Sequence, residues 1–339
     1  MTVHAPAPAA PVTLAEIDVP DHVRDTLAAH LVKEPGPCRD IDWAMTRYLQ
    51  IFARMPTELL QRFLDFGRHP DTPGVGHVRN LPVDPRLPGT PRDGRPSSEK
   101  ATFVAEGVLL GLSGLLGEPV GFATEKSGQL VHDVVPVASG ARTQTNQGSA
   151  VFLNFHNDIV HDPSGRYDLA SPDFLVLSCL RADPEGVAGT YYADARDICR
   201  ALDETTLRTL RSPLFRMNAP GSYVRDVAHG AEVLSDPVPM ISGPESCPEV
   251  SAAANGVRPL DDEARSALDR LQATCRAVAH HVLLRPGQAL LINNRKGLHA
   301  RSPFTAHYDG RDRWLQRTYV RRNQWDIRHR AVPGTRRLH

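Results

Sequence analysis

The segment Phe174-Leu175-Val176-Leu177-Ser178-Cys179-Leu180 is an apolar run of the length of one β-strand. Five further short runs share this β-like pattern: residues 130–136, 150–156, 190–193, 289–294 and 314–320. Turn-forming residues separate the runs, and short strands spaced in this way are typical of a β-sandwich or barrel. From residue 121 onward, the chain is therefore expected to form a β-rich core.

Helical patterns occur before this core and inside it. Residues 41–66 place apolar side chains at steps of three and four, and Pro56 is expected to start a second helix there. Three more helices are expected, at residues 98–116, 194–210 and 261–278. Residues 69–96 are dense in Pro, Gly and Asp and are expected to form a long irregular connection. This order of elements predicts an α+β fold. The chain contains no G-x-G-x-x-G or P-loop sequence, so a nucleotide-binding fold has no support.

The domain organisation follows from the same patterns. Residues 1–15 begin with a stretch rich in Ala and Pro and are expected to be a flexible leader. Residues 16–330 are expected to form a single domain, mainly helical over 16–120 and built on the β-rich core with its helical insert over 121–330. Residues 331–339 are expected to be a tail.

The composition excludes several classes of function. The chain has 339 residues with 39 Lys and Arg against 39 Asp and Glu, so its formal net charge is zero and no basic footprint for nucleic acid is present. No apolar stretch reaches the ~18 residues of a membrane span. The N-terminus lacks the features of a secretory signal, and the five cysteines form no C-x-x-C pair. These features predict reduced thiols, a cytoplasmic location and no membrane partner.

The candidate chemistry starts where the run 150–156 ends, at Phe155-His156-Asn157-Asp158. In a strand, residues i and i+2 point to the same face, so His156 and Asp158 present an imidazole and a carboxylate together. A second histidine would complete the set of two histidines and one carboxylate that leaves open positions on Fe(II) for a co-substrate and O₂. His299, which follows the run 289–294 after a short turn, is the candidate.

Two arginines lie beyond His299, around the run 314–320. Arg313 and Arg317 are two strand alternations apart, so both can face one cavity. A guanidinium binds a carboxylate through two hydrogen bonds, and two guanidinium groups can hold two different carboxylates. A metal site beside two inward arginines fits a 2-oxo acid and an amino-acid substrate bound together.

Five stretches of the chain match a known family: residues 155–158, 171–181, 189–195, 293–304 and 309–317. Together they resemble the clavaminate-synthase-like group of Fe(II)/2-oxoglutarate oxygenases. That group includes asparagine and arginine 3-hydroxylases of peptide-antibiotic pathways. The resemblance spans residues 101–320, with the motifs in the order that the family shows.

The resemblance implies a fold and a metal site. The fold would be a double-stranded β-helix, a distorted jelly roll, flanked by helices. His156, Asp158 and His299 would be the iron ligands, with 2-oxoglutarate as co-substrate and O₂ as oxidant. Three other histidines are expected to be structural or exposed: His132, His161 and His307.

The resemblance also implies contacts for the two organic molecules. Arg313 would pair with the distal carboxylate of 2-oxoglutarate, and Thr190 would help to hold it. Arg317 would bind the α-carboxylate of the amino-acid substrate. Glu125 would suit the α-ammonium group of that substrate, and Asn146 its carboxylate.

The chain departs from the family pattern at two positions. Antibiotic-pathway members commonly carry Glu as the second ligand, whereas this chain has Asp158, which is shorter but offers the same donor. Relatives that act on amide or guanidine side chains have an Asp where this chain has Ser251. Without that carboxylate a guanidinium substrate is disfavoured, because an unpaired buried cation is costly. A neutral polar or aliphatic side chain is expected, with Glu249 an alternative source of the lost charge.

These observations predict an Fe(II)/2-oxoglutarate-dependent hydroxylase of a free L-amino acid, acting at C3 or C4 in a specialised-metabolite pathway. The same site could instead perform desaturation or cyclisation, since that outcome depends on the fate of a radical and not on the ligands. A non-enzyme alternative is a β-sandwich binding module with a structural metal. That module would require four protein ligands in a closed zinc site, and the sequence supplies three clear ones.

Overall fold

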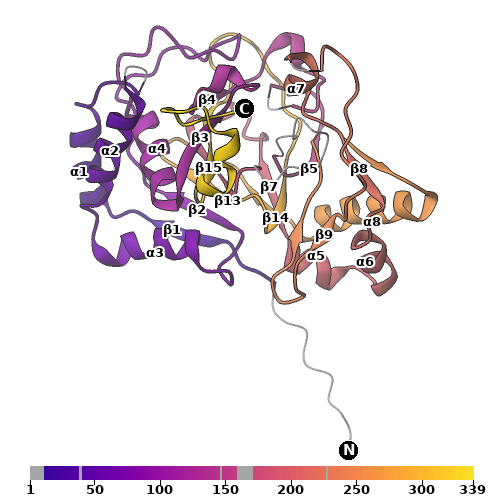
Figure 1. Ribbon diagram of the computed structural model, residues 1–339. Coiled ribbons are helices and arrows are strands. Elements are labelled where there is room, and N and C mark those ends of the chain that lie inside the picture. The colour runs from indigo at the N-terminus through magenta and orange to yellow at the C-terminus, as the bar shows by residue number, and fades with distance from the viewer. Residues whose placement is uncertain (1–10, 38–39, 146, 159–170, 227, 255) are drawn as a thin grey trace, which may run out of the picture.

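The computed structural model describes residues 11–37, 40–145, 147–158, 171–226, 228–254 and 256–339. Two β-sheets face each other, and helices cover the outer face of each sheet (Figure 1). Each sheet buries one face against the other and one face against helices, which is a stable way to enclose apolar side chains. The predicted α+β fold, a distorted jelly roll flanked by helices, is confirmed.

The main sheet carries the two longest strands, β6 and β15, as an antiparallel pair at its centre. Its strands lie in the order β1 (Ala15–Asp18), β2 (Val75–Arg79), β13 (Ala289–Asn293), β6 (Phe174–Arg181), β15 (Trp314–Arg321), β3 (Glu118–Phe122) and β16 (Arg337–Leu338), with β4 (His132–Val134) also paired to β15. The second sheet has the order β12 (His280–Val282), β7 (Thr190–Asp194), β14 (Gly297–Arg301) and β5 (Leu153–His156). Two small pairs join β8 (Phe215–Met217) to β11 (Val257–Pro259) and β9 (Ile241–Ser242) to β10 (Glu249–Val250).

Helices form the two outer layers. The main sheet is covered by α1 (Asp21–Leu31), α2 (Ile41–Phe52), α3 (Thr57–Arg68) and α4 (Val104–Leu116). The second sheet is covered by α5 (Ala195–Ala201), α6 (Glu204–Leu210) and α8 (Asp262–Val278). The remaining elements are α7 (Gly221–Asp226) and three 3-10 turns, η1 (Lys126–Gly128), η2 (Ala138–Gly140) and η3 (Trp325–Arg330). No helix of the described residues is long and apolar enough to cross a membrane.

The predicted helices need two corrections. The helix expected from residue 98 begins at Val104, because the Asp84 carboxylate accepts hydrogen bonds from the backbone N–H groups of Val104 and Ala105 and thereby caps the first turn from outside. The helix expected over residues 194–210 is two helices. Asp203 interrupts it, since its side chain accepts from the backbone N–H of Thr206 and caps a new helix.

The predicted strands and boundaries also need correction. Strand β2 lies inside the expected irregular connection 69–96, and β14 was expected only as a turn followed by His299. The expected tail 331–339 contributes β16, which pairs with β3. At the other end, β1 begins at the last residue of the expected leader and pairs with β2. Pairing with strands distant in the sequence creates each of these strands, which is why local patterns miss them.

Candidate active site

A cavity of about 620 Å³ lies between the two sheets. Strands β4, β6 and β15 line it from the main sheet, and β5, β7 and β14 line it from the second sheet. The loop around Glu125 and helix α7 complete the lining. Its volume is in the range of sites that bind small molecules.

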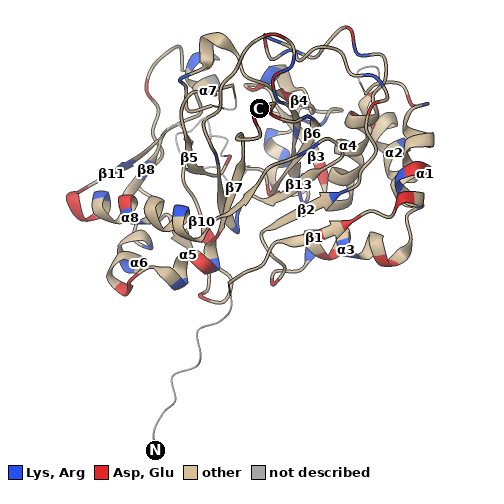
Figure 2. Ribbon diagram, turned by 180° about the vertical axis from the view of Figure 1, so that it is seen from behind, with Lys and Arg blue, Asp and Glu red and all other residues tan. Residues whose placement is uncertain are grey.

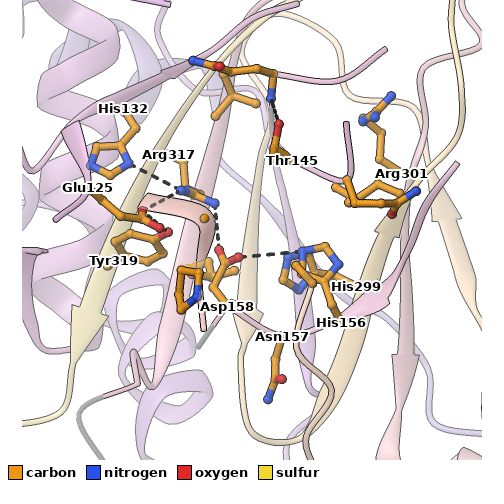
Figure 3. A pocket seen from close by; sticks show the side chains of 18 of the residues that line it. Glu125, His132, Thr145, His156, Asn157, Asp158, His299, Arg301, Arg317 and Tyr319 are labelled. Carbon is orange, nitrogen blue, oxygen red and sulfur yellow. Dashed lines mark hydrogen bonds and ion pairs between the residues drawn. The ribbon is translucent and has the colours of Figure 1, made fainter. Parts of the chain in front are cut away.

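Two histidines and one carboxylate meet in this cavity (Figure 3). His156 ends β5, Asp158 follows two residues later, and antiparallel pairing of β14 with β5 puts His299 opposite His156. The imidazole centroids are 4.3 Å apart, and His156 Nε2 is 3.7 Å from Asp158 Oδ1. One donor atom from each side chain lies within 4.8 Å of the others. The sequence-predicted trio is therefore brought together.

The protonation states of these three side chains suit a divalent cation. His156 Nδ1 donates to the Asn154 carbonyl at 2.7 Å, which leaves the Nε2 lone pair free. Burial lowers the pKa of His156, and burial beside His156 lowers the pKa of His299 to about 3, so both imidazoles are neutral. Burial alone would raise the pKa of Asp158, but the positive charge of Arg317 lowers it below its ordinary value. Two neutral nitrogens and one carboxylate are the donor set of non-haem Fe(II) sites.

Arg317 ties this trio to a second polar cluster. Its Nη1 donates to Asp158 Oδ2 at 2.8 Å, and its Nη2 lies 3.5 Å from Glu125 Oε2. The guanidinium lies over the Tyr319 ring at 4.4 Å from the centroid, and the Tyr319 hydroxyl donates to Glu125 at 2.8 Å. His132 Nδ1 is 3.4 Å from Arg317 Nη2. Arg317 and Glu125 thus both face the cavity, as the sequence predicts.

His132, which is expected to be structural or exposed, also lies at this site. It is buried, lines the cavity and lies opposite Arg317 in the pairing of β4 with β15. Its Nε2 bonds to the Gln129 carbonyl at 2.8 Å, so Nδ1 is left to accept from Arg317. The alternation along residues 130–136 predicts on which face of the strand His132 lies. No local sequence signal predicts the strand with which it pairs.

Arg313 lines the same cavity as Arg317. It is 5% exposed, and within the described ranges no carboxylate forms an ion pair with it. Its guanidinium lies over the Phe304 ring at 5.0 Å, and Arg301 lies over the same ring at 5.2 Å. Burial lowers the pKa of Arg313 to about 10, and burial together with Arg313 lowers that of Arg301 to about 9. Thr190 is paired with Arg301 in the β7–β14 ladder and also lines the cavity.

Arg301 was assigned no role from the sequence. It lies two residues after His299 in β14, so strand alternation alone would have put it on the same face. Two buried guanidinium groups around one aromatic ring form a strongly positive wall. A bound anion would compensate this positive charge, because an uncompensated buried charge is costly.

The remaining predicted residues are placed differently. Ser251 does not line the main cavity. Ser251 lines a neighbouring cavity of about 180 Å³. Its backbone N–H donates to the Met240 carbonyl, and this bond holds Ser251 behind Asn157. Glu249 lines that smaller cavity too and lies 3.5 Å from Arg295, so it does not replace the missing charge. Asn146 and His161 lie outside the described residues.

The fold and this site agree with the comparison to protein families. Residues 87–319 match the family described as taurine catabolism dioxygenase TauD, TfdA family. The chain therefore belongs to the TauD/TfdA family of dioxygenases, and the resemblance to its clavaminate-synthase-like members is confirmed.

Two individual relatives and one solved structure show which members of the family the chain resembles. The chain is 37% identical to the L-asparagine oxygenase of Streptomyces coelicolor over 268 residues, which is 78% of this chain and 76% of the relative. It is 30% identical to clavaminate synthase 2 of Streptomyces clavuligerus over 88% of this chain and 90% of the relative. The crystal structure of asparagine oxygenase with Fe(II), 3-hydroxyasparagine and succinate superposes with a TM-score of 0.84 and 32% identity, covering 95% of this chain and 98% of that one.

Proposed function

We propose that this chain is an Fe(II)/2-oxoglutarate-dependent dioxygenase that hydroxylates C3 or C4 of a free L-amino acid in a specialised-metabolite pathway. The observation that carries the proposal is a three-donor metal set and a buried, unpaired arginine in one cavity. Relatives described as L-asparagine oxygenase, L-lysine 3-hydroxylase and L-ornithine/L-arginine 3-hydroxylase support the amino-acid substrate.

His156, Asp158 and His299 would hold the iron. The neutral histidines, the ionised aspartate and the buried His299 Nδ1, which has no hydrogen-bond partner among the described atoms, fit a metal in this place. Three protein ligands leave positions for the co-substrate and O₂. The closed zinc site of a binding module would require a fourth ligand, and the described residues supply none within this cluster.

Arg313 would bind the distal carboxylate of 2-oxoglutarate. It is a buried cation without an ion-pair partner in the described part of the chain, and its Nε is an unsatisfied donor. Thr190 would add a hydroxyl at the same end, and Arg301 would reinforce the positive potential. A charge-assisted bond to a carboxylate in a dry site is worth ~1.5–3 kcal/mol.

The amino-acid substrate would occupy the side of the cavity near Arg317. Arg317 would take the α-carboxylate and Glu125 would take the α-ammonium group. Asn146, which lies outside the described residues, stays a predicted contact of the same carboxylate. Tyr319 already holds the Glu125 carboxylate and Asp158 already holds the Arg317 guanidinium, so these two side chains need little ordering when the substrate binds. Placing Ser251 in contact with the substrate would require a change in the segment that holds it behind Asn157.

The charges of the cavity favour a neutral polar substrate side chain. The carboxylates among its described lining residues are those of Glu125 and Asp158, and Arg317 is paired with both. A cationic side chain would find no free carboxylate there and would face Arg301 and Arg313 at the opposite end. We therefore do not expect this chain to act on lysine, although one relative is described as L-lysine 3-hydroxylase.

When bound, iron and 2-oxoglutarate would supply the oxidising power to remove hydrogen from an unactivated C–H bond. The residues of this chain would determine which bond reacts. Arg317 and Glu125 would fix the two charged groups of the substrate backbone, which leaves C3 and C4 to point toward the metal trio. The walls from both sheets would help to exclude water from the reacting atoms once the substrates are bound. We also propose a cytoplasmic location, since none of the four cysteines that the structure describes forms a disulfide.

The proposal is tested by adding amino acids one at a time to the protein with Fe(II), 2-oxoglutarate and O₂ and measuring succinate. At least one neutral polar amino acid should raise succinate above the uncoupled rate and yield a product 16 mass units heavier, the mass of one oxygen atom. His156→Ala should abolish the effect. Stimulation by lysine or arginine alone would contradict the side-chain assignment, and a product two mass units lighter would indicate desaturation or ring closure.

A further inference from the structure

The side chain of Asn294 holds the main chain of Asp158 through both of its polar groups. Its Oδ1 accepts from the Asp158 backbone N–H at 2.9 Å, and its Nδ2 donates to the Asp158 carbonyl at 2.6 Å. The same Nδ2 donates to the Pro172 carbonyl at 3.0 Å. Asn294 is 1% exposed, directly after β13, so these bonds are protected from water.

Asp158 has a particular need for this support. Strand β5 ends at His156, so Asp158 lies beyond the ladder that fixes the histidine. Asn157, between them, is held through its own side chain, which donates to the Val250 and Asn294 carbonyls and accepts from the backbone N–H of Ala252. The Asn294 amide thus gives Asp158 the donor and the acceptor that a neighbouring strand would otherwise supply.

The clamp leaves the Asp158 carboxylate little freedom. With the main chain held at both polar groups, only the two side-chain torsions remain. Arg317 occupies Oδ2 at 2.8 Å, which turns Oδ1 toward His156 Nε2. One oxygen is therefore presented to the metal position and the other is retained by the arginine.

We propose that Asn294 is a positioning residue for the metal centre: it holds the backbone of the carboxylate ligand Asp158 so that the three donors are preorganised. This rests on the proposed function, since it takes Asp158 as a ligand. Groups that orient metal ligands commonly change metal affinity by about 10- to 100-fold when removed.

Two substitutions dissect the clamp. Asn294→Leu has nearly the same shape and removes both polar groups. Asn294→Asp keeps an acceptor for the Asp158 N–H but loses the donor to the Asp158 carbonyl, so it should have an intermediate effect. Asn293→Ala is the matched control, because Asn293 is also buried but its side chain accepts only from the backbone of Arg295 and Lys296.

The test is a calorimetric titration of the metal-free full chain with Co(II), without 2-oxoglutarate, together with thermal melting with and without Co(II). Asn294→Leu should weaken Co(II) binding by about 10- to 100-fold. It should also reduce the increase in Tm that Co(II) produces. Asn294→Asp should fall between it and the wild type, and Asn293→Ala should lower the Tm of the metal-free protein while keeping Co(II) affinity within about threefold.

Two results would overturn the inference. If both Asn294 variants lower the Tm of the metal-free protein but bind Co(II) as the wild type does, the clamp is only structural. If Asn293→Ala loses as much affinity, the effect is general destabilisation. Failure of the proposed function itself looks different: His156→Ala would then bind Co(II) as tightly as the wild type. If Asn294→Leu does not fold, the Asn294→Asp titration decides between these outcomes.

Discussion

At the scale of single residues, Arg317 links the two halves of the site. One of its nitrogens binds a predicted iron ligand, Asp158, and another lies near Glu125, the predicted contact of the substrate ammonium. Any substrate carboxylate that reaches Arg317 therefore also acts on the side chain that holds the carboxylate ligand. Under the proposed function, substrate binding and metal geometry would be coupled through this one guanidinium group.

Arg313 carries the clearest single-residue prediction. Replacing it in Arg313→Gln should raise the 2-oxoglutarate concentration for half-maximal succinate formation by about 10- to 100-fold, because a charge-assisted bond to a buried carboxylate is lost. The KM for the amino acid should change much less. Arg311→Gln is a suitable control, since Arg311 is an exposed arginine two residues away. Equal changes in the two KM values would contradict the assignment of Arg313 to the co-substrate.

At the scale of elements, the turn η1 stores strain next to Glu125. Lys126 and Ser127 both adopt left-handed backbone angles, with φ of 47° and 56°, and Gly128 follows at 74°. A non-glycine residue in this region costs ~1–2 kcal/mol. The turn holds Glu125 through the bond from Gly128 N–H to the Glu125 carbonyl at 2.9 Å.

This strain predicts that Ser127→Gly will stabilise the protein. The free energy of unfolding should rise by ~0.5–1 kcal/mol, because glycine adopts these angles without steric cost but loses more entropy on folding. Ser127→Ala keeps the strain and should give no gain. Chemical denaturation of both variants measures the difference, and a gain in Ser127→Ala as large as that in Ser127→Gly would contradict the interpretation.

Elements also show how far the sequence could predict this structure. The run 174–180 became β6 almost unchanged, because a continuous apolar run is itself the signal of a buried strand. The strand β14, by contrast, consists of Gly-Leu-His-Ala-Arg and has little local β preference. Its pairing with β5 and β7 makes it a strand and brings His299 to His156.

The candidate site divides in the same way. The metal trio and both arginines were predictable, because the spacing of His156 and Asp158 and the family motifs around His299 and Arg313 are local. His132 and Asn294 were not, since their roles come from strands that meet only in the folded chain. Ser251 was expected to contact the substrate, but it lines the smaller neighbouring cavity instead of the main one.

At the scale of the whole molecule, a polar network joins the helical layer to the main sheet. Trp314 Nε1 and Gln316 Nε2, on the face of β15 opposite the cavity, donate to Asp133 Oδ1 at 2.6 and 3.1 Å. Gln316 also donates to Glu106 of α4, which is paired with Lys100. Burial raises the pKa of Asp133, so the folded protein holds that proton more tightly than the unfolded chain does.

The sign of this shift gives a pH prediction. The contribution of Asp133 to stability is fully present below its unfolded pKa, ~3.9, and is lost as the pH rises through the higher folded pKa. Asp133→Asn keeps the oxygen that accepts both hydrogen bonds and cannot ionise. Its Tm relative to the wild type should therefore increase from pH 4 to pH 7. A difference that stays constant or decreases over this interval would contradict the raised pKa.

The zero net charge of the chain hides a difference in charge between the exterior and the cavity. Lys, Arg, Asp and Glu are mixed over the outer helices, as Figure 2 shows, so the exterior is close to neutral. The cavity is different, since Arg301, Arg313 and Arg317 all face it. The molecule thus concentrates positive charge in the cavity, where small anions are proposed to bind, while its outer helices carry mixed charges.

The central claim is that one cavity holds Fe(II) and 2-oxoglutarate together. Its most direct test is an anaerobic titration of the Fe(II)-loaded protein with 2-oxoglutarate, followed by visible absorption. We expect a new visible band as the 2-oxo acid chelates the iron. This band should be absent from His156→Ala and should require more 2-oxoglutarate in Arg313→Gln. Tight binding of Zn(II) with no such band in the Fe(II) protein would contradict it.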